Sequence, residues 1–314
     1  MAIFKRMLAL LCVPLLFAGF AFAVPGEEDA HTNKGIQITP TSLNYEIMPG
    51  QSAPGSIIIT NLGKESISYD TETENFHKVD NEGAPYYEGV ERKEGVSSLA
   101  DWIKIAGNGG KGDLAPGEAV EVKFTIEVPA GAEPGGHYAA IFAKQSSGVA
   151  NLGGNQVGVI SRVGTTILVS VPGNVKKSAS IVTFIAPKIV WAGPVRFFMT
   201  VENTGTVHYD SEAKVELDPW FGNNEVIEMG KHTVVPKNQR DYKGEWKTVL
   251  PFGYYKVVAS ATDGDGKAEL VETSLIAIPI IIVLPLILLI ILIYLLVRYF
   301  RRNYRRVESV PPTS

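Results

Sequence analysis

Val120-Glu121-Val122-Lys123-Phe124-Thr125-Ile126-Glu127-Val128 alternates between apolar and polar side chains at every position. Because successive side chains of a β-strand point to opposite faces, this period of two predicts a strand with one buried and one exposed face. Similar runs recur along the chain, separated by turns that contain the Pro-Gly pairs 49–50, 116–117 and 134–135. Proline presets φ for one turn position and glycine permits positive φ at the next. The pattern predicts an all-β fold.

The strand-like runs fall into two groups, one on each side of Val171-Pro172-Gly173. The predicted strands of the first group are 35–38, 42–47, 56–60, 67–73, 120–128, 136–143 and 162–171. Those of the second group are 179–184, 195–202, 211–218, 231–235, 244–249, 254–261 and 267–272. We expect two tandem Ig-like or fibronectin-like β-sandwiches, over residues 36–173 and 174–274, preceded by a linker at residues 24–35.

A short internal repeat supports this division into two units. Ile59-Thr60-Asn61-Leu62-Gly63 resembles Val201-Glu202-Asn203-Thr204-Gly205, and each places Asn and Gly just after a strand, where a turn must start. Between the strands, residues 75–95 are polar, and residues 107–111 and 146–155 are Gly-rich, so we expect loops there. Long loops serve as binding elements or as plain surface connections, and both interpretations are open.

Residues 1–23 have the features of a cleaved signal peptide. Lys5 and Arg6 precede an apolar run, and Ala21-Phe22-Ala23 gives the small-x-small pattern of a cleavage site. An uncleaved N-terminal anchor is the alternative. The only cysteine, Cys12, lies inside this segment and is not preceded by the small residue of a lipoprotein signal. Cleavage would therefore leave no disulfide, and the sandwiches would depend on hydrophobic cores alone.

Residues 275–297 carry no charge and are almost all Leu, Ile, Val or Ala. As a helix this run would be about 34 Å long, enough to cross a hydrocarbon core of roughly 30 Å. Pro279 and Pro285 would break a soluble helix, but a membrane helix tolerates them with a kink. The run is followed by Arg298, Arg301, Arg302, Arg305 and Arg306. The positive-inside rule then predicts a single-pass protein of the cell membrane, with an extracellular N-terminal part and a basic cytoplasmic tail at residues 298–314.

Charge divides along the same boundary. The whole chain has a formal charge of −4, the first 23 residues carry +2 and the tail carries +4, so residues 24–274 carry −10. An acidic ectodomain argues against nucleic acid as a partner. The arginines of the tail serve as a stop-transfer signal or, alternatively, bind anionic lipid.

The first unit contains a series of motifs in a fixed order. They are Ile38-Thr39-Pro40-x-x-Leu43, Trp102-Ile103-Lys104-Ile105, Leu114-x-Pro116-Gly117-Glu118, Ile126-Glu127-Val128-Pro129 and Pro134-Gly135-Gly136-His137-Tyr138-Ala139-Ala140-Ile141. Over residues 36–172 this series resembles the N-terminal domain of the WxL-interacting protein family of Gram-positive surface proteins. The resemblance implies that the first sandwich binds peptidoglycan and the second a WxL surface protein, although the second is shorter here. No individual binding residue is carried over from the family.

Side chains that often carry chemistry do not form a recognisable catalytic or metal motif. The histidines lack metal-ligand spacing; they are His31, His77, His137, His208 and His232. Asp263-x-Asp265-Gly266 resembles the start of a calcium loop, but predicted strands flank it, which favours a hairpin turn. We therefore expect no metal and no cofactor.

Glu72 and Glu74 should point to the same face of a strand, as a glycosidase pair would, although solvated strand faces show the same spacing. The tryptophans are expected to pack in a core or at its rim, with sugar stacking as the alternative; they are Trp102, Trp191, Trp220 and Trp246. No catalytic, cofactor-binding or metal residue is assigned. The sequence predicts a non-enzymatic surface protein that binds cell-wall polymer or another surface protein. The alternative is an envelope sensor or assembly component that acts through a cytoplasmic partner.

Overall fold

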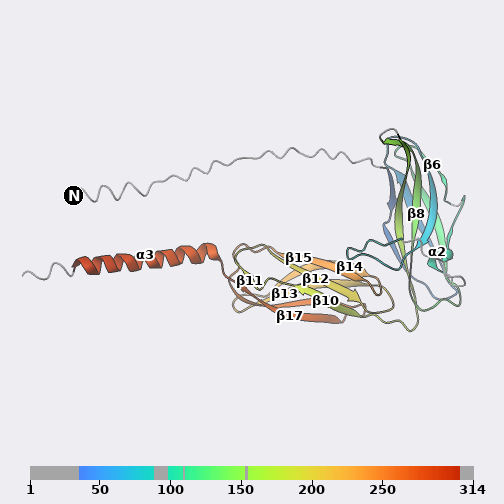
Figure 1. Cartoon of the computed structure of the whole chain (residues 1–314). Helices are drawn as coiled ribbons and strands as arrows, with labels where there is room; N and C mark the ends of the chain where they lie inside the picture. The colour runs from blue at the N-terminus through green and yellow to red at the C-terminus, as the bar shows by residue number, and fades with distance from the viewer. Residues whose placement is uncertain (1–34, 88–97, 109, 153–154, 305–314) are drawn as a thin grey trace, which may run out of the picture. The chain divides into compact units, whose positions relative to one another are not determined.

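The computed structural model describes residues 35–87, 98–108, 110–152 and 155–304. The predicted signal peptide, all of the linker except Gly35, and the tail from residue 305 lie outside the described residues. Within them, β-strands dominate and a single long helix, α3, follows the last strand (Figure 1). The predicted sheet-rich fold with a C-terminal apolar helix is therefore confirmed.

The N-terminal strands form two sheets, with the strand orders β1-β3-β7-β5 and β2-β9-β8-β4-β6. The first sheet contains β1 (Ile36–Thr39), β3 (Ser52–Asn61), β7 (Ala119–Glu127) and β5 (Ile103–Ile105). The second contains β2 (Ser42–Glu46), β9 (Asn155–Val171), β8 (Gly135–Leu152), β4 (Ile67–Asn75) and β6 (Gly112–Leu114). A single short helical turn, α2 (Leu99–Trp102), leads into β5.

A hydrophobic core lies between these two sheets. Strand β7 alternates as predicted: Val122, Phe124 and Ile126 are buried, whereas Glu121 and Lys123 are exposed. The buried residues of β7 join those of the neighbouring strands, of β8 and β9, and of α2 in one cluster. Alternation in the sequence therefore reports directly which face of a strand meets the core.

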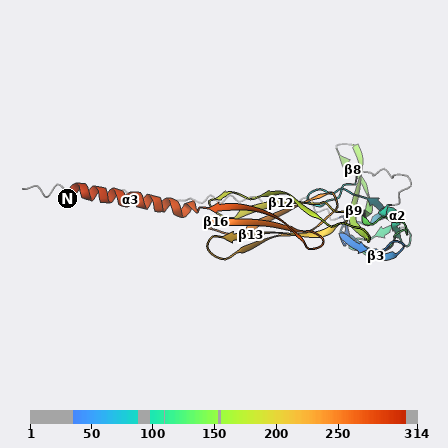
Figure 2. The same cartoon turned by 90° about the horizontal axis from the view of Figure 1, so that it is seen from below.

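The C-terminal strands form a second pair of sheets, with the orders β10-β12-β15 and β11-β17-β16-β13-β14. The first sheet contains β10 (Ala179–Ile185), β12 (Val195–Asn203) and β15 (Gln239–Trp246). The second contains β11 (Ile189–Val190), β17 (Ala268–Ala277), β16 (Gly253–Thr262), β13 (Tyr209–Pro219) and β14 (Glu225–Val234). Strands β13 and β16 run side by side in Figure 2, and a separate hydrophobic cluster fills the space between these sheets.

The predicted helix over 275–297 is wrong at both ends. Leu275 to Ala277 are the end of β17 and pair with β16, and α3 spans Ile280–Tyr304. Leu275 is fully buried in the core between the C-terminal sheets. The apolar run 275–297 therefore begins in a sheet and continues in the helix α3. Pro279 precedes the helix and its carbonyl accepts the N–H of Ile282 at 2.9 Å, whereas Pro285 lies inside the helix.

The Gly-rich segment 146–155 is also not the loop that we predicted. Strand β8 continues to Leu152 and β9 begins at Asn155, and the two pair with each other along this stretch. Gly and Asn lower strand propensity, but a hairpin needs only a partner strand in register. The short elements α2, β5, β6 and β11 were not predicted, because runs of two to four residues carry little periodic signal; of the elements this short, only β1 was predicted.

The internal repeat corresponds to a repeated hydrogen-bond pattern. Asn61 is completely buried. Its side-chain Nδ2 donates to the carbonyl oxygens of Glu65 and Leu114 at 2.8 and 3.0 Å. Its Oδ1 accepts the backbone N–H of Gly63 at 2.9 Å. One side chain therefore satisfies three backbone groups, two in the connection that follows β3 and one at the end of β6.

Asn203 makes the same three bonds at the end of β12. It is also completely buried. Its Nδ2 donates to the carbonyl oxygens of Val207 and Val234 at 2.9 and 2.8 Å, and its Oδ1 accepts the N–H of Gly205 at 2.8 Å. The weak sequence repeat thus marks equivalent structural positions in the two halves.

We predict that Asn203→Ala and Asn61→Ala each destabilise the protein by about 2–4 kcal/mol, since each leaves three buried backbone groups without their partner. The measurement is urea denaturation of the detergent-solubilised full-length chain. Unfolding is monitored by tryptophan fluorescence, to which the buried Trp102 and Trp246 contribute. Asn223→Ala, at an exposed position between β13 and β14, is the control and should change stability little. A loss below 1 kcal/mol at both buried positions would contradict the assigned role.

Candidate functional site

The carboxylates of Glu72 and Glu74 lie on the same face of β4, as predicted from their spacing. Arg162 Nη1 on β9 lies 2.8 Å from Glu74 Oε2 and 3.4 Å from Glu72 Oε1. Glu72 also pairs with Lys144 on β8. Both carboxylates are therefore engaged by cations across three neighbouring strands. This arrangement favours a charged patch on the sheet over a pair of acids poised for glycoside hydrolysis.

Two aromatic rings complete this patch. The guanidinium carbon of Arg162 lies 4.3 Å from the ring centroid of Phe142 and 5.6 Å from that of Tyr87. The Phe142 and Tyr87 rings meet edge to face at 4.7 Å. Burial raises the pKa of the Tyr87 hydroxyl to about 12. The cation is thus held between acids and rings, which fixes its position on the sheet.

The histidines of the described chain are not brought together. His137 is half-buried on β8, where its Nε2 lies 2.9 Å from the carbonyl oxygen of Glu133. His77 is exposed, and His232 packs against the Tyr242 ring. Asp263 to Gly266 form the predicted turn between β16 and β17. Across the residues that the structure describes, no group of three or more His, Cys, Asp or Glu is placed to hold a metal.

One histidine, His208, links the N-terminal and the C-terminal pairs of sheets. Its Nε2 lies 2.7 Å from Oδ1 of Asn44 on β2, and its Nδ1 lies 3.3 Å from the hydroxyl of Tyr138 on β8. The backbone N–H of His208 donates to the same hydroxyl at 3.1 Å. Because the Asn44 oxygen only accepts, Nε2 carries the proton, and Nδ1 accepts from Tyr138. This geometry fits a neutral imidazole and uses both of its nitrogens.

A second set of contacts at this junction comes from the segment after β4. The N–H of Val79 donates to Asn238 Oδ1 at 2.9 Å, and Asn238 Nδ2 donates to the carbonyl of His77 at 3.1 Å. The N–H of Asp241 donates to the carbonyl of Asn81 at 2.8 Å. The side-chain amide of Asn238 thus acts both as an acceptor and as a donor toward this segment. This part of the predicted loop 75–95 therefore contacts the C-terminal pair of sheets. Residues 88–95 lie outside the described residues.

The tryptophans divide into two pairs. Trp102 and Trp246 are buried in the two cores, and Trp246 Nε1 donates to Glu225 Oε2 at 2.7 Å. Trp191 is half exposed and Trp220 is 76% exposed, so the prediction of core or rim packing is wrong for Trp220. The Trp220 ring stacks instead on the ring of Phe221, which is also exposed, at 5.5 Å between centroids.

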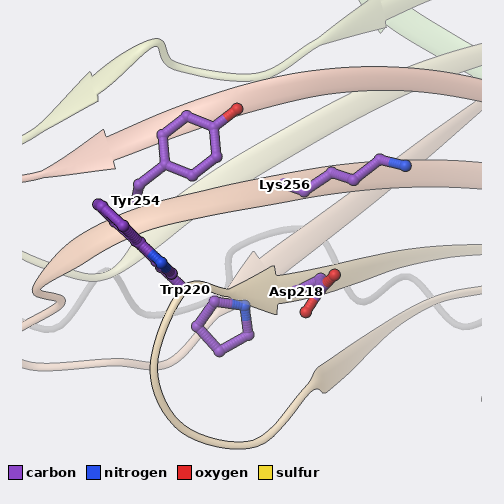
Figure 3. A pocket seen from close by; sticks show the side chains of 5 residues that line it. Asp218, Trp220, Tyr254 and Lys256 are labelled. Carbon is purple, nitrogen blue, oxygen red and sulfur yellow. The ribbon is translucent and has the colours of Figure 1, made fainter.

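Trp220 also lines a surface pocket with Pro219, Asp218, Tyr254 and Lys256. Figure 3 shows the Trp220 and Tyr254 rings together at one end of the pocket and Asp218 and Lys256 further along the strands. Lys256 Nζ is already paired with Glu272 at 2.8 Å. The pocket therefore offers mainly aromatic surface. The sequence contained one signal for it, an aromatic pair directly before Gly222-Asn223-Asn224, where turns normally carry polar residues.

A hairpin projects beyond the first pair of sheets. Strand β4 pairs with β8 only as far as Gln145, and β2 pairs with β9 only over Thr166–Ser170. Residues 146–152 of β8 and 155–160 of β9, which we call the projecting hairpin, lie in strands that pair with each other here and with no other described strand (Figure 2). The fifteen-residue sequence from Ser146 to Ile160 contains no charged side chain. Among the described strands, none pairs with the outer edges of this hairpin, a geometry that can accept an added strand.

No family model matches the sequence, and no curated protein matches it. Several solved structures are similar over most of the described chain. The YadV chaperone is 11% identical, with 76% of this chain and 99% of that chain covered and a TM-score of 0.37. The class 5 fimbriae chaperone CfaA is 11% identical, with 77% and 99% covered and a TM-score of 0.36.

The CupB2 chaperone of Pseudomonas aeruginosa is 10% identical, with 75% of this chain and 98% of that chain covered and a TM-score of 0.33. Because the identities and the TM-scores are low, none of these similarities determines what this chain does. Its function has to be argued from its own residues.

The junction predicts a dependence of stability on pH. Burial, with a smaller effect of Lys177, lowers the pKa of His208 from 6.5 to about 4, and Asp210 opposes the shift. Between these values the unfolded chain binds a proton that the folded chain does not, so stability falls as pH falls from about 6.5 to 4. The loss approaches roughly 3 kcal/mol at the acidic end.

The measurement is the urea midpoint of the full-length chain at about pH 7 and about pH 4.5. His208→Gln replaces the imidazole with an amide that can still donate and accept hydrogen bonds but does not titrate. This variant should show a smaller loss between the two pH values than the wild-type chain. His77→Gln, at an exposed position, is the control and should behave as the wild type does. An equal loss in the His208→Gln variant would show that His208 does not cause the pH dependence.

Proposed function

We propose that this chain is a non-enzymatic, single-pass surface protein whose ectodomain consists of two tandem Ig-like sandwiches, over residues 36–173 and 174–274. The ectodomain binds a cell-wall polymer or another surface protein. The observation that carries the proposal is the direct passage from β17 to α3, with only Ile278 and Pro279 between them. Where such a helix crosses a bilayer, a link of two residues holds the preceding sheet at the membrane surface.

Helix α3 supports the membrane part of the proposal. Its 25 residues give a length of about 37 Å, and the span from Ile280 to Arg302 is long and apolar enough to cross a membrane. Arg298, Arg301 and Arg302 occupy its last turns, which favours a cytoplasmic C-terminus. The predicted signal peptide would then place the sandwiches outside the cell.

The projecting hairpin supports the binding part. It is uncharged within an acidic ectodomain, so it can approach a partner without charge repulsion. The resemblance of residues 36–172 to the WxL-interacting protein family adds that the first sandwich recognises peptidoglycan. Under this proposal the hairpin belongs to the recognition surface of that sandwich.

The test is retention of the detergent-solubilised full-length chain by purified peptidoglycan sacculi. A shortened variant joins Ser146 to Ile160, which are paired in the hairpin, through Asn-Gly. We expect the wild-type chain to be retained and the shortened variant to lose at least about tenfold in affinity, which is about 1.4 kcal/mol. Asp265→Ala, in the exposed turn before β17, is the control and should bind as the wild type does.

Failure of the wild-type chain to bind sacculi would exclude the wall polymer as the ligand and leave a surface protein as the proposed partner. Crosslinking of intact cells, followed by purification of the full-length chain, then identifies that partner. Recovery of lipid alone would contradict both forms of the binding proposal.

The second candidate function is an envelope sensor or assembly component. The buried polar junction at His208 and the short passage into α3 favour it, because a load on the first sandwich can be transmitted to the helix. Under this alternative, truncation after Arg302 abolishes the cellular phenotype that the whole chain supports. Under the first proposal the truncated chain retains both its binding to sacculi and its phenotype, because residues 303–314 take no part.

A further inference from the structure

The end of the second pair of sheets from which α3 leaves carries three connecting loops. Strand pairing places them together: Pro219 lies opposite Tyr255, Tyr255 lies opposite Leu275, and Val195 lies opposite Trp246. We call residues 191–194, 220–224 and 247–252 the exit-end loops, because they lie at the end where the chain passes from β17 to α3.

Apolar side chains dominate the exit-end loops and are exposed. Phe221 is 82% exposed, Val249 79%, Trp220 76% and Phe252 74%. Trp191 is half exposed at the same end. Loops of soluble domains normally present polar residues to water, and aromatic side chains that are this exposed mark a surface for interaction.

The charge distribution at this end differs from that of the rest of the ectodomain. The exit-end loops contain no acidic residue, and Lys247 is their only charged residue. Next to the loops, Lys188 adds a second cation. Of the acids that flank loop 220–224, Glu225 accepts a hydrogen bond from Trp246 Nε1, and Asp218 lines the same pocket as Lys256. The turn at the opposite end of β16 and β17 is Asp263-Gly264-Asp265-Gly266 and contains no apolar residue. The two ends of one sheet are therefore built for different surroundings.

Chain connectivity fixes the distance between the exit-end loops and α3. Three residue steps separate Ala277 from Ile280, so the helix begins within about 11 Å of the end of β17. Trp220 follows β13, which is two strands from β17 in the sheet, or about 10 Å to the side. If α3 crosses the membrane, these loops lie within reach of its surface.

We propose that the exit-end loops insert into the headgroup region of the lipid bilayer that α3 crosses. Trp and Tyr rings favour this region because they combine an apolar body with a polar edge, and Phe and Val bury apolar surface there. Lys188 and Lys247 contact anionic headgroups. The ectodomain is then held at the membrane at several points instead of by one flexible attachment. This inference rests on the proposed membrane crossing of α3.

The test uses the full-length chain with Cys12→Ser, so that each introduced cysteine is the only one. An environment-sensitive fluorophore is attached at Phe221→Cys, at Asp265→Cys or at Leu288→Cys. Asp265 is the matched control, in an exposed turn at the opposite end of the same sheet, and Leu288 reports on α3 itself. Each chain is reconstituted into vesicles of phosphatidylcholine and phosphatidylglycerol, with or without a spin-labelled lipid that quenches fluorescence on contact.

We expect the label at position 221 to emit at shorter wavelength than the label at 265, and to be quenched by the spin-labelled lipid at least about twofold more. The label at 288 should be quenched as well. Quenching at 288 without quenching at 221 would overturn the present inference and leave the membrane helix intact. Absence of quenching at 288 would overturn both.

A water-soluble quencher, iodide, separates lipid from protein as the cover of these loops. Protection of position 221 from iodide together with quenching by spin-labelled lipid supports insertion into the bilayer. Protection from iodide without lipid quenching shows that protein covers the loops, either a second copy of this chain or part of the same one, and overturns the inference. Free access of iodide to position 221 overturns it too.

Discussion

A buried asparagine at the end of a strand is the constraint on which each of the two pairs of sheets depends. The backbone groups at the end of β3 and of β12 face the interior, where water cannot satisfy them. An amide side chain supplies two donors and one acceptor from a single position, and Asn61 and Asn203 use all three. In each half the bonds tie the turn after the strand to the last residue of another strand, Leu114 of β6 or Val234 of β14. The same solution therefore occurs twice.

The turns that face these asparagines show how the two halves differ. The backbone carbonyl of Asn61 accepts the N–H of Gly117, which has φ +76, and that of Asn203 accepts the N–H of Lys237, which has φ +60. A left-handed conformation costs a lysine roughly 1 kcal/mol more than a glycine. The turn of Lys237 also includes Asn238, whose side chain binds the segment after β4. The strained turn therefore places a residue of the junction, a role that the first turn does not have.

The sequence predicted most of the strands because one face of each strand meets a core, and alternation such as that of β7 records this directly. The Asn-Gly repeat predicted equivalent turns for a different reason: in both turns a buried asparagine side chain satisfies backbone groups that water cannot reach. The start of the helix could not be predicted, because the apolar run continues across it. Leu275 is buried in the core between two sheets, whereas Ile280, in α3, is exposed in the described protein. His208 also escaped prediction. Its partners, Asn44 and Tyr138, are far away in the sequence, and only the folded chain brings them together.

The two ends of the second pair of sheets illustrate a general difference between polar and apolar contacts. Hydrogen bonds such as those of His208 and Asn238 require partners at fixed distances and angles, so they suit a junction between parts of one folded chain. Burial of apolar surface has no such directional requirement. Trp220, Phe221 and Phe252 are exposed next to the start of α3, and a lipid surface, which offers no fixed geometry, is the environment that matches them. The polar end therefore favours a contact with fixed protein groups, and the apolar end favours a contact with a fluid lipid surface.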